Sequence, residues 1–378
     1  ETDIICNVPH LRFPEFSGEW VTKSINDLAV VIGGGTPDTT VKSYWDGEIQ
    51  WFTPSEIGKN KYVDSSLRTI TEVGLNNSSA KLLPPNTILL SSRATIGECS
   101  LSLRECATNQ GFQCLVSKKC NVDFLYYLIQ TKKKDLIRKS CGSTFLEISA
   151  NEVRKIQVSV PSDVEQQKIA ELLSLIDERI ATQNKIIEDL KKLKSAISLK
   201  MLHSDSWEQF KIQDIASIGR GRVISSVEIS QQENPLYPVY SSQTSNDGIM
   251  GYLDDFMFEG EYISWTTDGA NAGTVFYRNG KFNCTNVCGL LKLKKGFDAH
   301  FVSLVLAEAT RMYVSTNLAN PKLMNNTMGN IQIRLPKLEE QKRISVVFRK
   351  LHGLLETHNS LIIKYSKQKQ YLLSQMFI

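Results

Sequence analysis

Apolar residues recur at alternating steps of four and three along two long stretches of the chain. In the first stretch they are Ile169, Leu173, Ile176, Ile180, Ile187, Leu190, Ile197 and Met201. In the second they are Ile344, Phe348, Leu351, Leu355, Ile362, Tyr365, Leu372 and Met376. This spacing aligns the side chains along one side of a helix, as in a coiled coil. The pattern predicts two long helices, and we call the apolar stripe of each helix its seam.

The two stretches are copies of each other. Residues 335–377 repeat residues 160–202 without a gap, at a constant offset of 175. The steps at which the seam is interrupted are polar in both copies, and these are Gln183 with His358 and Lys194 with Lys369. Matched polar breaks in an internal repeat indicate two helices that share one seam. The alternative, two unrelated amphipathic helices that each pack only on their own domain, stays open at this stage.

Both helices have a start signal. Pro161 and Pro336 stand at equivalent positions, and acidic residues follow each of them. Proline suits the first helical turn, and carboxylates favour the positive end of the helix dipole. At 1.5 Å per residue, we expect rods of about 55 to 60 Å.

The rest of the sequence is of another kind. Residues 1–159 and 204–334 alternate short β-branched or aromatic runs with loops rich in Gly, Asn, Ser and Thr, which predicts mixed α+β globules. The two stretches are weakly alike, since Trp20 matches Trp207. We therefore expect, in order, domain one (1–159), a spacer helix (160–203), domain two (204–334) and a second spacer helix (335–378).

Distances predict the direction of the helices. Only residues 203–206 join the first helix to domain two. A compact domain of this size is about 36 Å across, so a parallel second helix would have to begin about 55 Å back along the first. An antiparallel pair needs no such reach. We predict an α+β fold in which two similar mixed α/β domains are separated by two long antiparallel coiled-coil helices, with a pseudo-two-fold repeat.

Composition adds a broad class. The chain has 378 residues, 41% hydrophobic and 22% charged, which is ordinary for a soluble protein of two or more domains. No apolar run is long enough for a membrane span and no signal sequence is evident, so we expect a cytoplasmic protein without a membrane partner. The sequence opens at Glu1, which indicates a trimmed native start. Eight cysteines without a CxxC pair predict small buried thiols rather than a zinc site.

The net charge of +4 belongs to the predicted helices rather than to the globules. Residues 165–203 carry +1 and residues 339–378 carry +4, which leaves −1 for everything else. Charge alone therefore does not predict that the globules bind nucleic acid.

No motif for catalysis or cofactor binding is complete. The glycine run at Gly33 lacks the Gly-Lys-Ser/Thr ending of a phosphate-binding loop and predicts a turn between strands. The tetrapeptide at Asn234 has Leu236 where amino-methyltransferases that flip a base have proline, and no GxGxxG stretch accompanies it. The stretch at Pro37 resembles a metal nuclease but has Gln50 where lysine is needed. We expect no catalytic residue, no metal and no cofactor.

Four stretches carry a family resemblance. They are NVPHLRFPEFSGEW from Asn7, GEIQWFTPSEIG from Gly47, YPVYSSQTSNDGIMGYLDD from Tyr237 and YISWTTDGANAGTVFYRNGKFNCTN from Tyr262. Together with the two PxxxEQxxI helix starts, they resemble type I restriction-modification specificity subunits over nearly the whole chain. Four motifs in the right order on a two-fold repeat make this resemblance specific.

The resemblance implies a non-catalytic subunit of a restriction and methyltransferase complex. Each globule would be a target-recognition domain for one half of a split site in double-stranded DNA. The helices would set the separation of the domains and dock two methyltransferase subunits, and motor-nuclease restriction subunits would join for cleavage. Two-fold related modules on a rigid spacer also suit two half-sites on one face of a duplex. Because the domains have diverged, we expect an asymmetric bipartite site.

Amides, hydroxyls, arginines and lysines on loops can hydrogen-bond to base edges. In domain one, the candidate DNA-binding residues are Thr53, Ser55, Lys59, Arg93, Asn109 and Gln110. In domain two, they are Arg220, Arg222, Ser241, Ser242, Gln243, Asn246, Asn271 and Asn286, with Tyr240 and Trp265 expected to pack on sugars or thymine methyl groups. The competing interpretation of any one of them is a turn residue that hydrogen-bonds its own backbone.

Two other functions stay open on the sequence. A self-contained DNA methyltransferase would bind a methyl donor as an isolated chain. A coiled-coil scaffold without nucleic acid would be excluded by sequence-selective DNA binding of the assembled complex.

Overall fold

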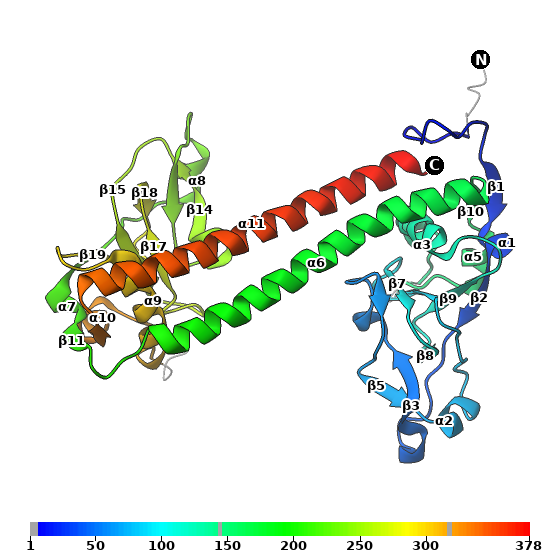
Figure 1. The fold of residues 1–378 in the computed structure, drawn as a ribbon, viewed down its shortest axis with the longest axis horizontal. Coiled ribbons are helices and arrows are strands. Elements are labelled where there is room, and N and C mark those ends of the chain that lie inside the picture. Colours follow the sequence, from blue (N-terminus) through cyan, green and yellow to red (C-terminus); the bar gives the residue numbers. More distant parts are fainter. Residues whose placement is uncertain (1–6, 143–145, 316–319) are drawn as a thin grey trace. The chain divides into compact units, whose positions relative to one another are not determined.

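The computed structural model describes residues 7–142, 146–315 and 320–378. The chain divides into two compact units, Glu1–Ile186 with His358–Ile378 (unit one), and Ile187–Thr357 (unit two). Each unit holds one mixed α/β globule and part of each of two long helices (Figure 1).

The two long helices are α6 (Asp163–Met201) and α11 (Leu338–Met376), each of 39 residues. Each begins just after the proline of its start signal, and acidic residues occupy its first turn. The predicted helices are confirmed, and they are continuous because no proline interrupts either of them.

Within each unit the two helices run antiparallel, as predicted. In unit one the first half of α6 lies beside the last part of α11, because Asp177 forms an ion pair with Lys369 at 2.7 Å. In unit two the end of α6 lies beside the start of α11, where Ile197 packs against the cluster that contains Ile344 and Phe348.

The seam residues are all at least half-buried. Those below a tenth exposed are Ile169, Leu173, Ile176, Ile187, Ile344, Phe348, Leu351, Leu372 and Met376. The half-buried ones are Ile180, Leu190, Ile197, Met201, Leu355, Ile362 and Tyr365. Both interpretations of the seam therefore hold in part, since Ile169 and Leu173 also belong to the same core cluster as Trp20 and Phe124 of the globule. The ends of the helices pack on a domain as well as on each other.

The described residues of unit one form sheets ordered β2-β9-β6-β7-β4, β5-β3-β8 and β1-β10. Its elements before α6 are β1 (Val21–Ser24), α1 (Ile25–Leu28), β2 (Ala29–Gly33), β3 (Trp45–Phe52), β4 (Tyr62–Val63), β5 (Arg68–Ile70), α2 (Glu72–Asn76), β6 (Ile88–Leu90), β7 (Cys99–Ser102), β8 (Cys106–Thr108), β9 (Gln113–Ser117), α3 (Val122–Thr131), α4 (Lys133–Arg138), α5 (Ala150–Lys155) and β10 (Gln157–Val160). The core forms around α3, which buries six consecutive residues from Phe124 to Ile129. A helical stretch that is buried on every side has to be apolar or aromatic, and these six residues are, while the polar Asp123, Gln130 and Thr131 lie at the helix ends.

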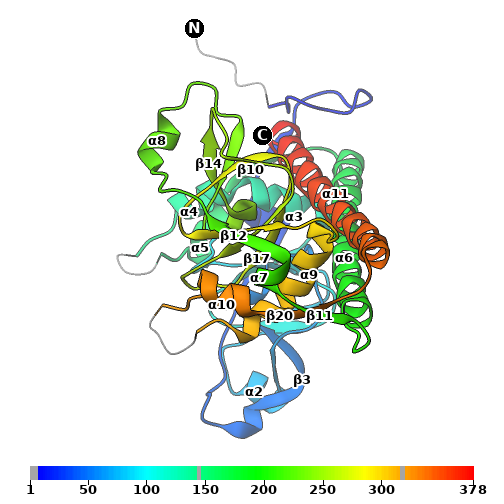
Figure 2. The ribbon, with the colours of Figure 1, turned by 90° about the vertical axis from the view of Figure 1, so that its left-hand side faces the viewer.

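Unit two repeats this plan, with sheets β12-β19-β16-β17, β14-β13-β18-β15 and β11-β20. Its elements before α11 are β11 (Glu208–Lys211), α7 (Ile212–Ile215), β12 (Ala216–Arg220), α8 (Ser226–Ser230), β13 (Tyr237–Tyr240), β14 (Ile249–Leu253), β15 (Phe258–Glu259), β16 (Tyr262–Thr266), β17 (Val275–Arg278), β18 (Lys281–Cys284), β19 (Cys288–Leu293), α9 (Ala299–Ala309), α10 (Asn325–Asn330) and β20 (Gln332–Leu335). Helix α9 packs on β17 (Figure 2). It is the counterpart of α3 in unit one, because Phe301 of α9 matches Phe124 of α3 in the repeat. In both units the strand before the first short helix pairs antiparallel with the strand before the long helix.

Five of the seven cysteines in the described residues are buried, as predicted, and two are not. Cys6 lies outside the described residues, and the cysteines that are buried are Cys99, Cys106, Cys114, Cys284 and Cys288. Cys120 is half-buried, and Cys141, which follows α4, is exposed. No helix in the part of the chain that the structure describes is long and apolar enough to cross a membrane.

Candidate nucleic-acid interface

Two strands of unit one run parallel and end side by side. Strand β3 pairs with β8, and the last residues of the two strands, Phe52 and Thr108, stand opposite each other. The backbone amide of Asn109 donates to the carbonyl of Phe52 at 3.1 Å. Because the strands end together, the segments that begin at Thr53 and Asn109 leave the sheet at the same edge.

The glycine run after β2 packs on this edge. The amide of Gly35 donates to the carbonyl of Thr108 at 2.8 Å, and Trp51 Nε1 donates to the carbonyl of Gly35 at 2.9 Å. A Cβ on Gly34 would lie 1.9 Å from the carbonyl oxygen of Asn109, so only glycine fits there. The run is thus a turn that supports the strand ends, and it brings Thr36 Oγ1 to a hydrogen bond with Gln110 Oε1.

Unit two builds the same edge from β13 and β18. These strands are also parallel, with Tyr240 opposite Cys284, and the amide of Thr285 donates to the carbonyl of Tyr240 at 2.9 Å. A Cβ on Gly221 would lie 1.7 Å from the carbonyl oxygen of Cys284. Ser241 and Asn286 therefore leave the sheet as Thr53 and Asn109 do in unit one.

The candidates of domain one fall into three groups. Thr53 and Asn109 hold their own turns, since Thr53 Oγ1 donates to Glu56 at 2.6 Å and Asn109 Oδ1 accepts from the amide of Gly111 at 2.8 Å. Gln110 is exposed at the strand ends and Ser55 is exposed in the turn that follows β3. These bonds agree with the turn-residue interpretation of Thr53 and Asn109, and DNA contact by all four residues stays a prediction.

Two further candidates of domain one are placed by other contacts. Arg93 forms an ion pair with Glu147 at 2.9 Å. The backbone amide of the preceding residue, Ser92, donates to the carbonyl of Gly111 at 2.8 Å, and this contact brings Arg93 near the strand ends. Lys59 instead lines a cavity of about 410 Å³ against α6, so the structure does not bring it together with the others.

In domain two the two arginines are held by neighbours. Arg220 Nε donates to Asn325 Oδ1 at 2.9 Å, and Arg222 forms an ion pair with Glu228. This pairing raises the pKa of Arg222 and lowers the pKa of Glu228. Arg222 stays charged in any case and lies exposed directly beside Cys284 at the end of β18.

The loop after β13 carries most of the remaining candidates. Ser241, Ser242 and Gln243 are half-buried and Asn246 is exposed with a positive φ of 49°. Asn271 and Asn286 are exposed, Asn286 at the strand ends and Asn271 in the turn between β16 and β17. The exposed amides and hydroxyls of this edge offer donors and acceptors of the kind that contact base edges.

Trp265 is a correction. It is fully buried and donates its indole Nε1 hydrogen to the carbonyl of Leu323 at 2.9 Å. It packs against Gly289 of the neighbouring strand, where a Cβ would lie 2.2 Å from the indole ring. Trp265 is a core residue of unit two and leaves the set of DNA-binding candidates.

Arg278 is a functional candidate that sequence reasoning missed. Its side chain is 2% exposed, its guanidinium lies 3.6 Å from the ring centroid of Tyr240, and Nη1 pairs with Asp247 at 2.7 Å. It therefore fixes both ends of the loop from Ser241 to Gly248. No local signal could have found it, because its partners lie on strands and loops about 30 to 40 positions away.

The part of the chain that the structure describes contains no group of three or more His, Cys, Asp or Glu side chains placed to hold a metal ion. The sites described above are thus polar loop edges supported by glycine turns, and they occur once in each unit.

Comparison with known proteins agrees with this duplication. The family model for the type I restriction modification DNA specificity domain matches twice, over residues 17–192 and 204–364. The MjaIX specificity subunit of Methanocaldococcus jannaschii is 39% identical over 180 residues, which is 46% of this chain and 42% of that relative, so the match spans less than half the length of that protein. A putative type I specificity subunit of Mycoplasma pneumoniae is 35% identical over 246 residues, which is 61% of this chain and 89% of that relative.

The fold has a solved counterpart. The crystal structure of a type I restriction-modification S subunit from M. genitalium superposes with a TM-score of 0.70 at 17% identity, covering 98% of this chain and 99% of that one. At such identity the likeness concerns the fold alone. Since the family model covers both halves of the sequence, the chain belongs to the family of type I restriction-modification DNA specificity subunits.

Proposed function

We propose that this chain is the non-catalytic subunit that selects the DNA sequence in a type I restriction-modification complex, and that each domain recognises one half of a bipartite site. The observation that carries the proposal is the polar edge at the ends of a parallel strand pair, which occurs in both units. The side chains that differ at matching positions of the two edges, such as Gln110 in unit one and Val287 in unit two, predict different half-sites.

Domain exchange tests this assignment. We take residues 1–159 and 204–334 as the recognition domains and residues 160–203 and 335–378 as the spacers. Replacing residues 204–334 with the corresponding domain of another specificity subunit should change one half-site and leave the other, as mapped by methylation in the host. A chimera in which both half-sites changed would contradict independent recognition.

The spacers are proposed to act as a ruler. An insertion of four residues lengthens a helix by about one turn, or about 6 Å, which is close to the rise of two base pairs. Inserting four residues into both α6 and α11 should lengthen the unspecified spacer of the recognised site. An unchanged spacer would refute the ruler.

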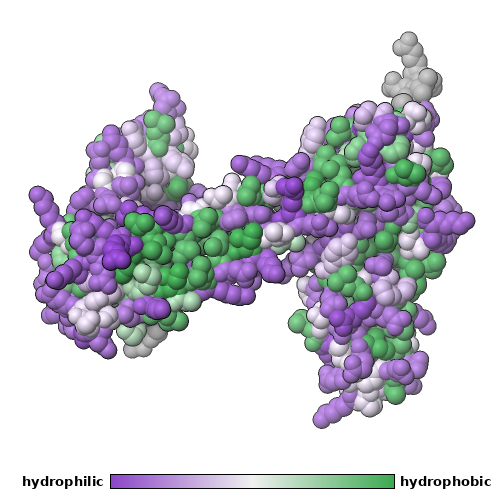
Figure 3. Space-filling model, viewed as in Figure 1, coloured by the Kyte–Doolittle hydropathy of each residue, from purple (hydrophilic) through white to green (hydrophobic). Residues whose placement is uncertain are grey.

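Partner subunits are proposed to supply the catalysis. Exposed apolar side chains are frequent on the two helices, and Figure 3 shows apolar surface on the helical stretch of unit two. The exposed ones on α6 and α11 are Val164, Leu175, Leu193, Leu199, Val346, Leu354, Ile363 and Tyr371. Apolar surface of this kind marks a protein interface. We assign it to two methyltransferase subunits, to which motor-nuclease subunits add for restriction.

The charge distribution makes the proposed DNA affinity depend on those partners. Affinity for DNA comes largely from released counterions, and log K falls by about 0.9 per neutralised phosphate as log salt rises. Outside the spacers the net charge is −1, so the domains can meet few phosphates. The isolated chain should bind its site weakly, and tight binding should need the methyltransferase subunits. A salt titration with and without those subunits tests this, and nanomolar binding by the chain alone in about 150 mM salt would overturn it.

A further inference from the structure

In unit one the segment 7–20 covers the place where the start of α6 lies beside the end of α11. Arg12 donates two hydrogen bonds to the carboxylate of Glu165, from Nε to Oε1 and from Nη2 to Oε2, both at 2.8 Å. Trp20 Nε1 donates to the same carboxylate at 3.3 Å, and the amide of Leu11 donates to the carbonyl of Gln375 at 2.9 Å. Glu165 is only 1% exposed, so the segment buries this charge and satisfies it.

An aromatic contact adds a second anchor. The ring centroid of Phe13 lies 4.9 Å from Lys168 Nζ, and Lys168 also pairs with Glu15. Segment 7–20 is therefore held by the ion pair of Arg12 with Glu165 and by the cation–π contact of Phe13 with Lys168, which lies about one helical turn after Glu165.

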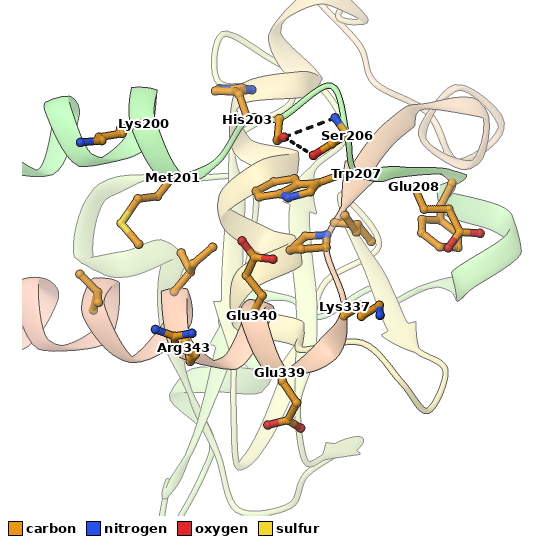
Figure 4. A pocket seen from close by; sticks show the side chains of 16 residues that line it. Lys200, Met201, His203, Ser206, Trp207, Glu208, Lys337, Glu339, Glu340 and Arg343 are labelled. Carbon is orange, nitrogen blue, oxygen red and sulfur yellow. Dashed lines mark hydrogen bonds between the residues drawn. The ribbon is translucent and has the colours of Figure 1, made fainter.

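The equivalent place in unit two is a cavity of about 1060 Å³ (Figure 4). Half of the residues that line it have counterparts around the corresponding place in unit one, among them Gln375, Glu165 and Lys168, which contact segment 7–20. Lys200, Met201, Trp207, Pro336, Glu340, Arg343, Ile344 and Val347 correspond to Gln375, Met376, Trp20, Pro161, Glu165, Lys168, Ile169 and Leu172.

The cavity exists because the repeat is incomplete at this point. In unit one a separate segment leads into Trp20, whereas in unit two the residues before Trp207 are the end of α6 and a short connection. Among the described residues of unit two, none donates to Glu340 as Arg12 donates to Glu165. Glu340 is exposed, and within the described residues its carboxylate forms no ion pair. The carbonyl of Lys200 lies in the last turn of α6, where no intrahelical donor follows it.

We propose that this cavity is a docking site for a segment of a partner protein that carries an arginine next to aromatic residues, bound as segment 7–20 is bound in unit one. The partner's arginine forms an ion pair with Glu340, and an aromatic ring of the partner packs on the guanidinium of Arg343. A backbone amide of the partner donates to the carbonyl of Lys200. Charge complementarity and the filled copy in unit one define this chemistry. The inference does not depend on DNA recognition.

A labelled peptide with the sequence of residues 7–20, NVPHLRFPEFSGEW, tests the proposal on the full chain by fluorescence anisotropy. Saturable binding is expected. Glu340→Gln in the chain, or Arg12→Gln in the peptide, should weaken binding about tenfold or more, and the two changes together should cost little more than one of them. Glu339→Gln is the matched control, because Glu339 also lines the cavity but its counterpart Val164 is an exposed residue without a part in holding the segment.

Three results would overturn the proposal. One is the absence of saturable binding at about 1 mM peptide. Another is an equal loss for Glu339→Gln and Glu340→Gln, which would show a general charge effect. The third comes from a photoreactive group at position 13 of the peptide, if its cross-links fall outside residues 200–210 and 335–347. A chain that is dimeric in sedimentation equilibrium, and that the peptide converts to monomers, would assign the cavity to the N-terminal segment of a second copy instead.

Discussion

His358 Nδ1 donates a hydrogen bond to Oε1 of Gln183 at 2.5 Å, and these residues occupy the same place in the two copies of the repeat. A residue contacts its own counterpart only where a local two-fold axis passes between two copies. The helices α6 and α11 therefore meet here like the helices of a symmetric dimer. The interruption of the seam that the sequence shows at both positions is one hydrogen-bonded pair.

This pair should cost stability rather than add it. Changing His358→Leu alone leaves the half-buried Gln183 amide without its partner and should lower the unfolding free energy by about 1 kcal/mol. Gln183→Leu with His358→Leu should recover that loss or exceed the parent, because a polar seam position fixes register at the expense of stability. Urea denaturation measures both. Asn184→Leu and Asn359→Leu serve as the control, because these two exposed residues follow Gln183 and His358 and also match each other in the repeat. If the double variant Gln183→Leu with His358→Leu lost as much stability as the two single variants together, the prediction would be contradicted.

A second pair across the helices should behave in the opposite way. Asp177 accepts from Lys369 and, at 2.7 Å, from the hydroxyl of Tyr127, and both charged side chains are less than a fifth exposed. Burial, followed by the charge of Asp177, raises the pKa of Tyr127, so the hydroxyl stays protonated and remains a donor. Asp177→Ala leaves both donors unsatisfied and should cost about 2 to 4 kcal/mol.

A double-mutant cycle with Lys369→Met isolates the ion pair and should give a coupling of about 1 kcal/mol or more. The exposed pair of Arg104 with Asp64 is the control, and Asp64→Ala should cost less than about 1 kcal/mol. Equal losses at the two sites would show that burial gives the first pair no advantage.

His300 makes unit two sensitive to acid. Burial, with a further contribution from the positive charge of Arg349, lowers the pKa of His300 to about 4, and its Nδ1 lies 3.1 Å from Ser345 Oγ. The unfolded chain binds this proton below about pH 6.5, whereas the folded chain resists it, so stability falls as the pH drops from 6.5 towards 4. After a discount for partial exposure, the loss should be about 1 to 2 kcal/mol.

Urea midpoints at pH 7, 5.5 and 4.5 measure this loss. His300→Gln should flatten the pH dependence over that interval, while the exposed His352→Gln should leave it close to that of the parent. A His300→Gln variant as sensitive to acid as the parent would show that other groups account for the effect.

Gly221, which supports the strand ends of domain two, is predicted to be required for the full stability of unit two. Gly221→Ala forces a Cβ against the carbonyl of Cys284 and should destabilise unit two by about 2 kcal/mol or more. Gly219→Ala provides the matched control, since nothing lies within 4 Å of a Cβ there. Thermal denaturation of the two variants compares them, and equal melting temperatures would mean that the loop shifts freely.

Two asparagines of one segment should separate recognition from folding. Asn286 is exposed at the strand ends, whereas Asn283 is buried, with Nδ2 donating to the carbonyl of Asp255 at 2.7 Å and Oδ1 accepting from the amide of Met257 at 3.1 Å. Asn286→Ala should relax one half-site and change stability by less than about 0.5 kcal/mol. Asn283→Ala should lower stability by about 1 to 3 kcal/mol without changing the site. Methylation mapping and thermal denaturation together distinguish these outcomes.

The sequence predicted the helices well because their signal is local. The steps from Ile169 to Met201 specify a helix and its buried side without any knowledge of what covers it. The elements that cover this buried side could not be predicted from the sequence. Leu173 is buried by the globule and by α11 together, because the chain returns to unit one near Leu372.

The candidate site was harder to predict because exposure depends on neighbours. Trp265 and Tyr240 lie in similar polar stretches, but Trp265 stands opposite Gly289 on the next strand and fills the space that the glycine leaves. Arg278 has no local mark at all, since its role comes from Tyr240 and Asp247. The composition of a stretch shows that it is polar, but which of its side chains are buried depends on the strands that pair with it.

The core of unit one includes Leu372, Met376 and Phe377, and the ring of Phe377 stacks on Phe124 with centroids 5.3 Å apart. Residues 372–377 are translated nearly two hundred codons after the rest of that core. At about 5 to 20 residues per second, this delay is about 10 to 40 s. Unit one therefore starts to leave the ribosome before unit two but is completed after it, and during that interval its open apolar surface beside Phe124 is a part of the nascent chain that a chaperone would have to protect.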